Sequence, residues 1–131
     1  MKILLLTPQL PYPPRQGTTI RNFNLLRLLA RRHTVDLFTF LAPGEALTRE
    51  SPLHQLCRRI VCVEQPPRPT WRRAQETLLS PLPDMALRLA SRAAHTRMTS
   101  LVQAAVAEGA PYHLVQAEGI EMGGYGLQAV T

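Results

Sequence analysis

The stretch LLLTPQLPYPPRQGTTIRNFNLLRLLARRHTVDLFTF, residues 4–40, decides the expected fold. Residues 2–7 are almost entirely apolar and end at Pro8, which predicts a buried strand. The next ten residues include five Pro or Gly, so a loop is expected over 8–17. A helix is expected from Thr18 or Thr19 to about Arg32, followed by a strand over 35–40 that is rich in strand-forming residues.

Helices and strands are expected to alternate through the rest of the chain. They are a helix over 45–58 interrupted at Pro52, a strand over 59–64, a proline-rich connector over 65–69, a short helix over 71–79, a helix over 85–108 capped by Asp84 and ended by Gly109, and a strand over 112–117. No element is expected in the glycine-rich residues after 118.

This alternation predicts an α/β fold over residues 1–131, a single Rossmann-like domain with a mostly parallel sheet and flanking helices. Doubly wound sheets use five or six strands, so four strands predict an incomplete domain. An incomplete sheet has an uncovered edge, through which a second copy of the chain could pair.

The composition favours an anionic partner. The formal net charge is +6, and all but one of the fifteen Lys and Arg residues are arginines. Such a balance is typical of proteins that bind nucleotide phosphates, acidic lipid headgroups or nucleic acid. The aromatic strand or recognition helix of a nucleic-acid-binding domain is not present, so no nucleic-acid partner is expected.

Neither the N-terminus nor the cysteines indicate secretion, a membrane span or a metal site. The apolar run in residues 1–7 is too short for a signal peptide and no run would span a bilayer, so a cytoplasmic location is expected. Cys57 and Cys62 are five residues apart, which fits neither a CxxC redox motif nor a zinc knuckle. Free thiols and no metal are therefore expected.

The proline-rich loop stands where parallel sheets bind ligands. It follows the carboxyl end of the first expected strand and precedes a helix start, whose free N–H groups and dipole attract phosphate. Gly17 would let the backbone approach such a ligand, and Arg15 and Arg21 would add charge-assisted hydrogen bonds. Alternatively, the prolines stiffen a long loop and Gly17 permits a turn. Neither the G-x-G-x-x-G nor the P-loop signature is present.

Two other positions each have two interpretations. Glu118 follows the last expected strand, where it either faces the cleft and accepts a substrate hydroxyl or is an exposed loop acid; Glu121 and Tyr125 are weaker candidates nearby. Trp71, flanked by two arginines, either touches anionic lipid headgroups at the membrane surface or is a core tryptophan. The core position is favoured.

Residues 4–40 resemble the opening of family 4 glycosyltransferases of the GT-B fold. Those proteins begin with a short strand, a P-x-P-P-x-x-G loop, an R-x-x-N-L-L-x-x-L helix and the segment RH-x-V-x-L. The matching positions here are Pro11, Pro13, Pro14, Gly17, Arg21, Asn24, Leu25, Leu26, Leu29, Arg32, His33, Val35 and Leu37. The later segment YHLVQAEGIEMGGY resembles the fourth strand of that family and the loop after it.

The resemblance implies the N-terminal, acceptor-side domain of a retaining glycosyltransferase, which moves a sugar from a nucleotide-sugar donor to an acceptor without a metal or other cofactor. It places Gly17 against the donor diphosphate, with Arg15 and Arg21 nearby. Many relatives carry a histidine after the fourth strand, where this chain has residues 116–118, Gln-Ala-Glu. The nucleotide-binding C-terminal domain of the family is missing, so the chain alone is expected to be inactive. The alternative is a stand-alone α/β module that binds an anionic ligand or a protein partner.

Overall fold

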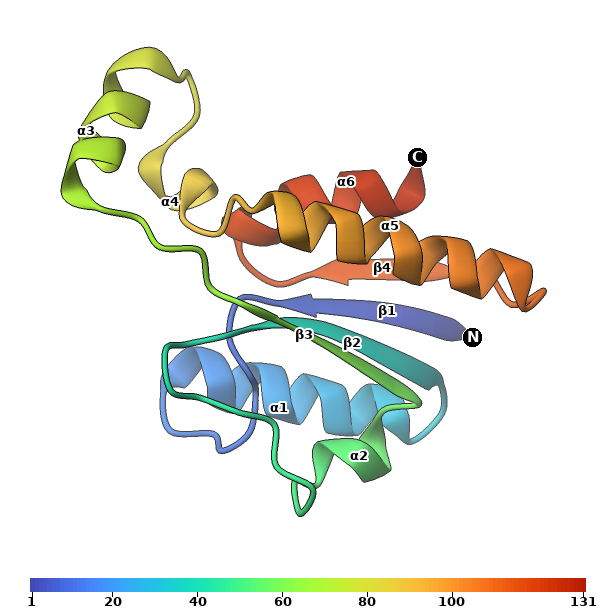
Figure 1. Ribbon diagram of the computed structural model, residues 1–131. Coiled ribbons are helices and arrows are strands. Elements are labelled where there is room, and N and C mark those ends of the chain that lie inside the picture. Colours follow the sequence, from blue (N-terminus) through green and yellow to red (C-terminus); the bar gives the residue numbers. More distant parts are fainter.

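The computed structural model describes residues 1–131, and its helices and strands alternate along the chain (Figure 1). In chain order the elements are β1 (Lys2–Thr7), α1 (Gly17–Ala30), β2 (Thr34–Leu41), α2 (Leu53–Leu56), β3 (Arg59–Glu64), α3 (Thr70–Leu79), α4 (Asp84–Leu87), α5 (Arg92–Ala107), β4 (Leu114–Ala117), the 3₁₀ helix η1 (Ile120–Met122) and α6 (Gly123–Val130). The bounds of β1 and β3 are those that the sequence predicts.

The four strands are all parallel and lie in the order β3-β2-β1-β4. All six residues of β1 are buried, with Ile3 opposite Val35 on one side and Leu114 on the other. Helices cover both faces of this central strand, which is why its sequence is continuously apolar rather than alternating. The expected Rossmann-like α/β fold is confirmed. The edge strands are β3 and β4, and pairing of an edge with a second copy stays a prediction.

Alternate residues of β1 enter two separate cores, as the two-residue period of a strand requires. Leu5 packs in a core with Leu26 of α1 and Leu37 of β2. Leu4 and Leu6 pack in the other core, which α5 and α6 close. Figure 1 shows α1 and α2 on one face of the sheet and α5 and α6 on the opposite face.

The start of α1 differs slightly from the sequence expectation. The helix begins at Gly17, and Gln16 rather than Thr18 or Thr19 is the N-cap residue. Thr19 still stabilises the first turn, because its Oγ1 accepts a hydrogen bond from the Gln16 N–H at 3.0 Å. As a consequence, Gly17 lies inside the first turn of the helix and not in the loop before it.

The helix expected over 45–58 is wrong for most of that range, because only Leu53–Leu56 is helical. Pro52 has no N–H to donate, so it stands before the first turn of α2 rather than inside a longer helix. Upstream, the Glu45 carboxylate accepts the N–H of Ala42 at 2.9 Å, which closes a turn where a helix start is expected.

The helix expected over 85–108 is also wrong in part, since it is two helices, α4 and α5, with a break between them. The Ser91 side chain caps α5 by accepting the Ala94 N–H at 3.2 Å. The hydroxyl of Tyr125 fixes the break: it donates to the Leu89 carbonyl at 2.5 Å and accepts the Ser91 N–H at 3.1 Å.

Tyr125 belongs to α6, which lies in the glycine-rich segment where no element is expected. Met122 and Tyr125 are both buried in the core that α5 also covers. The core that contains Phe38 and Phe40 of β2 is thus covered in part by residues whose composition suggests a loop. Gly109 ends α5 as predicted, with a φ of +69° that favours glycine.

The helix α3 forms where it is expected, but in a different environment. It has no buried residue, and Trp71 is 68% exposed, so the prediction of a core tryptophan is wrong. In Figure 1, α3 and α4 project beyond the end of the sheet at which the strands terminate. None of the helices is both long enough and apolar enough to cross a membrane.

Candidate functional site

An open cavity of about 460 Å³ lies at the carboxyl end of the sheet, between the start of α1 and the segment after β4. Three of the four site residues proposed from the sequence line it together: Gly17, Arg21 and Glu118. Its other lining residues are Pro8, Thr18, Asn22, Met85, Gly119, Ile120 and Glu121. The topology explains the grouping, because β1 and β4 are neighbours and the segments that leave their carboxyl ends emerge side by side.

Gly17 is exposed, and the fold does not require glycine at this position. Its φ is not in the left-handed region, and a Cβ added there would meet nothing within 4 Å. The structure therefore gives no support to the interpretation that Gly17 serves only to permit a turn. The N–H groups of Gly17 and Thr18 are the first two of α1 and have no intrahelical acceptor, which leaves them available to an anion.

The carboxylate of Glu118 is buried and paired with the guanidinium of Arg21, whose own side chain is largely exposed. Gln116 Nε2 donates to the other carboxylate oxygen at 2.8 Å, and the Glu118 N–H extends the sheet ladder to the Leu6 carbonyl at 2.9 Å. Glu118 is thus fixed at the cavity wall, and the interpretation as an exposed loop acid is wrong. Because Arg21 forms the solvent side of the pair, an anion in the cavity can compete with Glu118 for the guanidinium.

A second buried carboxylate, that of Glu121, lies in the same cavity and accepts a hydrogen bond from Arg88 Nη2 at 3.1 Å. Gly119 allows this placement: its φ is +99°, and a Cβ would lie 2.8 Å from a Glu121 carboxylate oxygen. From the sequence, Glu121 is only a weak candidate and Gly119 carries no prediction. A glycine between two acids just after a parallel strand is the signal that could have found both.

Asn22 is a hydrogen-bond donor without a partner. It is only 1% exposed, it lines the cavity, and its Nδ2 makes no hydrogen bond. An unsatisfied buried donor is unfavourable by about 1–3 kcal/mol, so an oxygen atom of a bound ligand would be stabilised at this point. Sequence reasoning missed Asn22, because a single asparagine within a helix forms no pattern.

Arg15, the fourth predicted site residue, does not join the other three. It lines a neighbouring cavity of about 430 Å³ together with Gln16 and Glu45. The loop that carries it is folded against α1, where the Tyr12 and Phe23 rings are 5.3 Å apart. The stiffness of the loop thus comes from packing as well as from its prolines.

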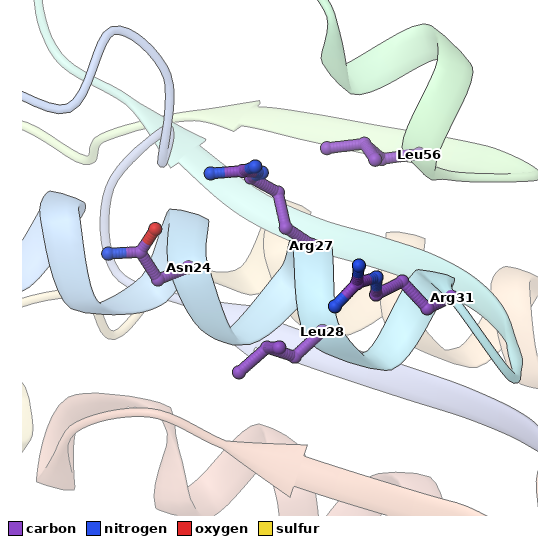
Figure 2. Close-up of a pocket in the computed structure, with 5 residues that line it drawn as sticks. All are labelled: Asn24, Arg27, Leu28, Arg31 and Leu56. Carbon is purple, nitrogen blue, oxygen red and sulfur yellow. The ribbon is translucent and has the colours of Figure 1, made fainter.

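A third cavity, of about 400 Å³, lies on the outer side of α1. Figure 2 shows its lining residues, which are Asn24, Arg27, Leu28 and Arg31 of α1 and Leu56 of α2. Arg27 and Arg31 are one helical turn apart, and no acidic side chain lines the cavity. This hollow is cationic, and it lies along the middle and last turns of α1 rather than at the start of that helix.

The fold and the first cavity define a Rossmann-like α/β protein with a polar cavity at the carboxyl end of its parallel sheet. The chain matches no protein-family model, no curated protein and no solved structure. No group of three or more His, Cys, Asp or Glu side chains is placed to hold a metal ion, and both cysteines are free. His113 lies at the opposite end of the sheet, where its Nδ1 accepts the Lys2 N–H at 3.0 Å.

Proposed function

We propose that this chain is the acceptor-side domain of a retaining glycosyltransferase. One observation carries the proposal: Gly17, Arg21 and Glu118 line a single cavity at the start of α1, although Glu118 lies about a hundred residues from the other two in the sequence. The resemblance of residues 4–40 to family 4 glycosyltransferases supports the same assignment, since it points to the same helix start.

The two sides of the cavity suit two parts of a sugar-transfer reaction. On the α1 side, the free N–H groups at Gly17 and Thr18 and the helix dipole would stabilise the negative charge of a departing nucleoside diphosphate. Arg21 would add a cation when an anion displaces it from Glu118. No metal is needed for this stabilisation.

On the β4 side, the chemistry suits a neutral, hydroxyl-rich acceptor. The carboxylates of Glu118 and Glu121 can accept hydrogen bonds from it, and across the cavity the unpaired Nδ2 of Asn22 in α1 is left to donate one. The two carboxylates would repel an anion bound beside them. The diphosphate would therefore bind at Gly17, and the acceptor hydroxyls would bind at the glutamates. The nucleotide itself would be held by a second domain, as in the family that the sequence resembles.

A test begins with the chain in solution. We expect nucleoside diphosphate sugars and inorganic pyrophosphate to shift the amide NMR resonances of Gly17 and Thr18, and we expect no sugar transfer by the chain alone. Gly17→Val should weaken this binding by about tenfold or more, because its side chain would occupy the space that the anion needs. Folding should be preserved, since a Cβ at Gly17 meets nothing within 4 Å.

Gly124→Val is the matched control, because Gly124 is also an exposed helical glycine whose Cβ would meet nothing within 4 Å and it does not line the cavity. Equal affinity of the Gly17 and Gly124 variants would contradict the proposal. Turnover of a nucleotide sugar by the chain alone would contradict its assignment as one half of the enzyme.

The second candidate function is a stand-alone module that binds an anionic ligand. The cationic cavity at Arg27 and Arg31 is the observation that favours it (Figure 2). Phosphate-induced shifts confined to α1 residues 24–31, and lost in Arg27→Gln, would support this module against sugar transfer.

A further inference from the structure

The helix α3 differs from an ordinary surface helix because its apolar face is exposed. Trp71, Leu78 and Leu79 are spaced seven and eight residues apart and therefore share one face of the helix. This apolar face is directed to solvent: Leu78 is 83% and Leu79 is 76% exposed. Leu82 and Met85, in the segment that follows, are also exposed.

The polar side of α3 faces α4 and the connector that precedes α3. Glu76 is the most shielded side chain of its central turns, and it pairs with Arg68 at 2.7 Å. Arg68 also pairs with Asp84 at 2.9 Å, and Arg73 pairs with Asp84 at 3.3 Å. These ion pairs hold α3 against α4 with its apolar face outward. An ordinary surface helix buries its apolar face against the protein core. The exposure of that face in α3 therefore indicates a partner that covers it.

We propose that residues 68–88, here called the docking arm, insert Trp71, Leu78 and Leu79 into the headgroup region of an anionic lipid bilayer.

The charge distribution of the arm fits an anionic membrane surface. The arm contains four arginines and two acidic residues. Both acids, Glu76 and Asp84, are in ion pairs on the inner side of α3, so no free carboxylate borders the apolar face. Arg72 and Arg73 are exposed beside it. Tryptophan and leucine on one face with arginine at the border is the composition of helices that lie in a membrane interface.

A second copy of the chain fits this surface less well. A parallel pairing of two arms would place the exposed Arg72 and Arg73 of one copy near those of the other, and like charges across an interface are unfavourable. The net charge of +6 for the whole chain adds to this repulsion and to the attraction toward anionic lipid.

Docking would bring the first cavity close to the bilayer. The arm projects from the end of the sheet at which β1 and β4 terminate (Figure 1), and Met85 at its base is one of the cavity residues. If the chain transfers sugars, which is the separate proposal above, its acceptor would then be held in or at the membrane. The docking itself rests only on the arm and does not depend on that proposal.

Trp71 is the only tryptophan, so its fluorescence reports the position of the arm directly. We expect vesicles of phosphatidylcholine mixed with phosphatidylglycerol to shift the emission of the chain to shorter wavelength. Vesicles of pure phosphatidylcholine should have a weaker effect, and salt should reduce binding to the anionic vesicles. The double variant Leu78→Ser, Leu79→Ser should lower the partition coefficient by about tenfold or more, because each leucine side chain loses most of its transfer free energy.

The matched control is Val106→Ser, Leu127→Ser, which changes two exposed apolar residues outside the arm and should leave partitioning unchanged. Both double variants should retain the circular dichroism spectrum of the native chain, because all four side chains are exposed. Absence of an emission shift with anionic vesicles, or equal partitioning of the two double variants, would overturn the proposal. So would a concentration-dependent dimer that is lost in the Leu78, Leu79 variant, because it would assign the face to a second copy.

Discussion

Replacing Asp36 tests how much a single buried carboxylate contributes to the fold. Asp36 is fully buried in β2 and accepts hydrogen bonds from Arg58 Nε at 3.1 Å, from Arg58 Nη2 at 2.9 Å and from the Tyr112 hydroxyl at 2.6 Å. Asp36→Asn keeps the shape of the side chain, but it removes the charge and places an amide N–H₂ toward groups that also donate.

The expected loss of stability follows from the number of hydrogen bonds that Asp36 accepts and from their burial. Hydrogen bonds to a charged group contribute about 1.5–3 kcal/mol each, and breaking a buried ion pair is unfavourable by about 3–5 kcal/mol. The Arg58 side chain is 37% exposed and also reaches Glu108, so it would not be left unpaired. We therefore expect Asp36→Asn to lower the free energy of unfolding by about 3 kcal/mol, toward the lower end of that range. Tyr112→Phe, which removes one of the three bonds, should lower it by about 1.5 kcal/mol.

The difference between the native chain and Asp36→Asn should depend on pH. Burial alone would raise the pKa of Asp36, but hydrogen bonds from Arg58 and Tyr112 outweigh burial and hold the pKa below its ordinary value. A carboxylate with a lowered pKa stabilises the folded state above the unfolded-state pKa of about 3.9, and this contribution is lost as the pH falls through the folded-state pKa. The two proteins should therefore converge in stability in acid.

The assay is urea denaturation followed by circular dichroism, since the exposed Trp71 makes fluorescence a poor probe of the core. Glu108→Gln is the control, because Glu108 contacts the same Arg58 from the surface and should have a much smaller effect. An Asp36→Asn change no larger than that of Glu108→Gln at neutral pH would refute the reasoning. So would a difference that does not shrink in acid.

Two further predictions concern single residues. Gly119→Ala should destabilise the chain by about 1–3 kcal/mol, because the φ of Gly119 is +99° and a Cβ would lie 2.8 Å from the Glu121 carboxylate. Gly124→Ala is the control, since a Cβ there meets nothing within 4 Å, and equal urea midpoints of the two variants would contradict the prediction. Cys57 should resist Ellman's reagent until the chain unfolds, because burial, with a smaller contribution from the Asp36 charge, raises the pKa of its thiol to about 12. Rapid modification of both Cys57 and Cys62 in the native chain would show that the Cys57 environment is open.

The elements that the sequence predicts well are those with local causes. The apolar run of β1 and the breakers that follow it are neighbours in the chain, and so are the strand formers of β3 and the prolines after them. Gly109 likewise ends α5 through its own backbone conformation. The alternation of such elements is enough to predict a parallel α/β sheet, because few other arrangements can bury continuously apolar strands on both faces.

The candidate site could be predicted only in part. The proline-rich loop between β1 and α1 predicts a helix start that can bind an anion, and Gly17 and Arg21 lie in the first turns of that helix. The pairing of Arg21 with Glu118 depends on β4 lying next to β1, and the sequence gives no direct indication of strand order. The unpaired Nδ2 of Asn22 could not be predicted for the same reason, because only the folded structure shows that no acceptor lies within hydrogen-bond distance of it.

The amino-acid sequence by itself determined where the four strands and the helices α1 and α3 form, that a proline-rich loop joins β1 to α1, and how much positive charge the chain carries. The tertiary structure alone decided that Tyr125 divides one expected helix into two, that the Asp36 carboxylate forms an ion pair with Arg58, and that Trp71 is exposed to solvent. The physical reason is the range of the interactions. Propensity and capping act over about one helical turn, whereas a hydrogen bond or an ion pair depends on groups that the fold brings together from distant parts of the chain.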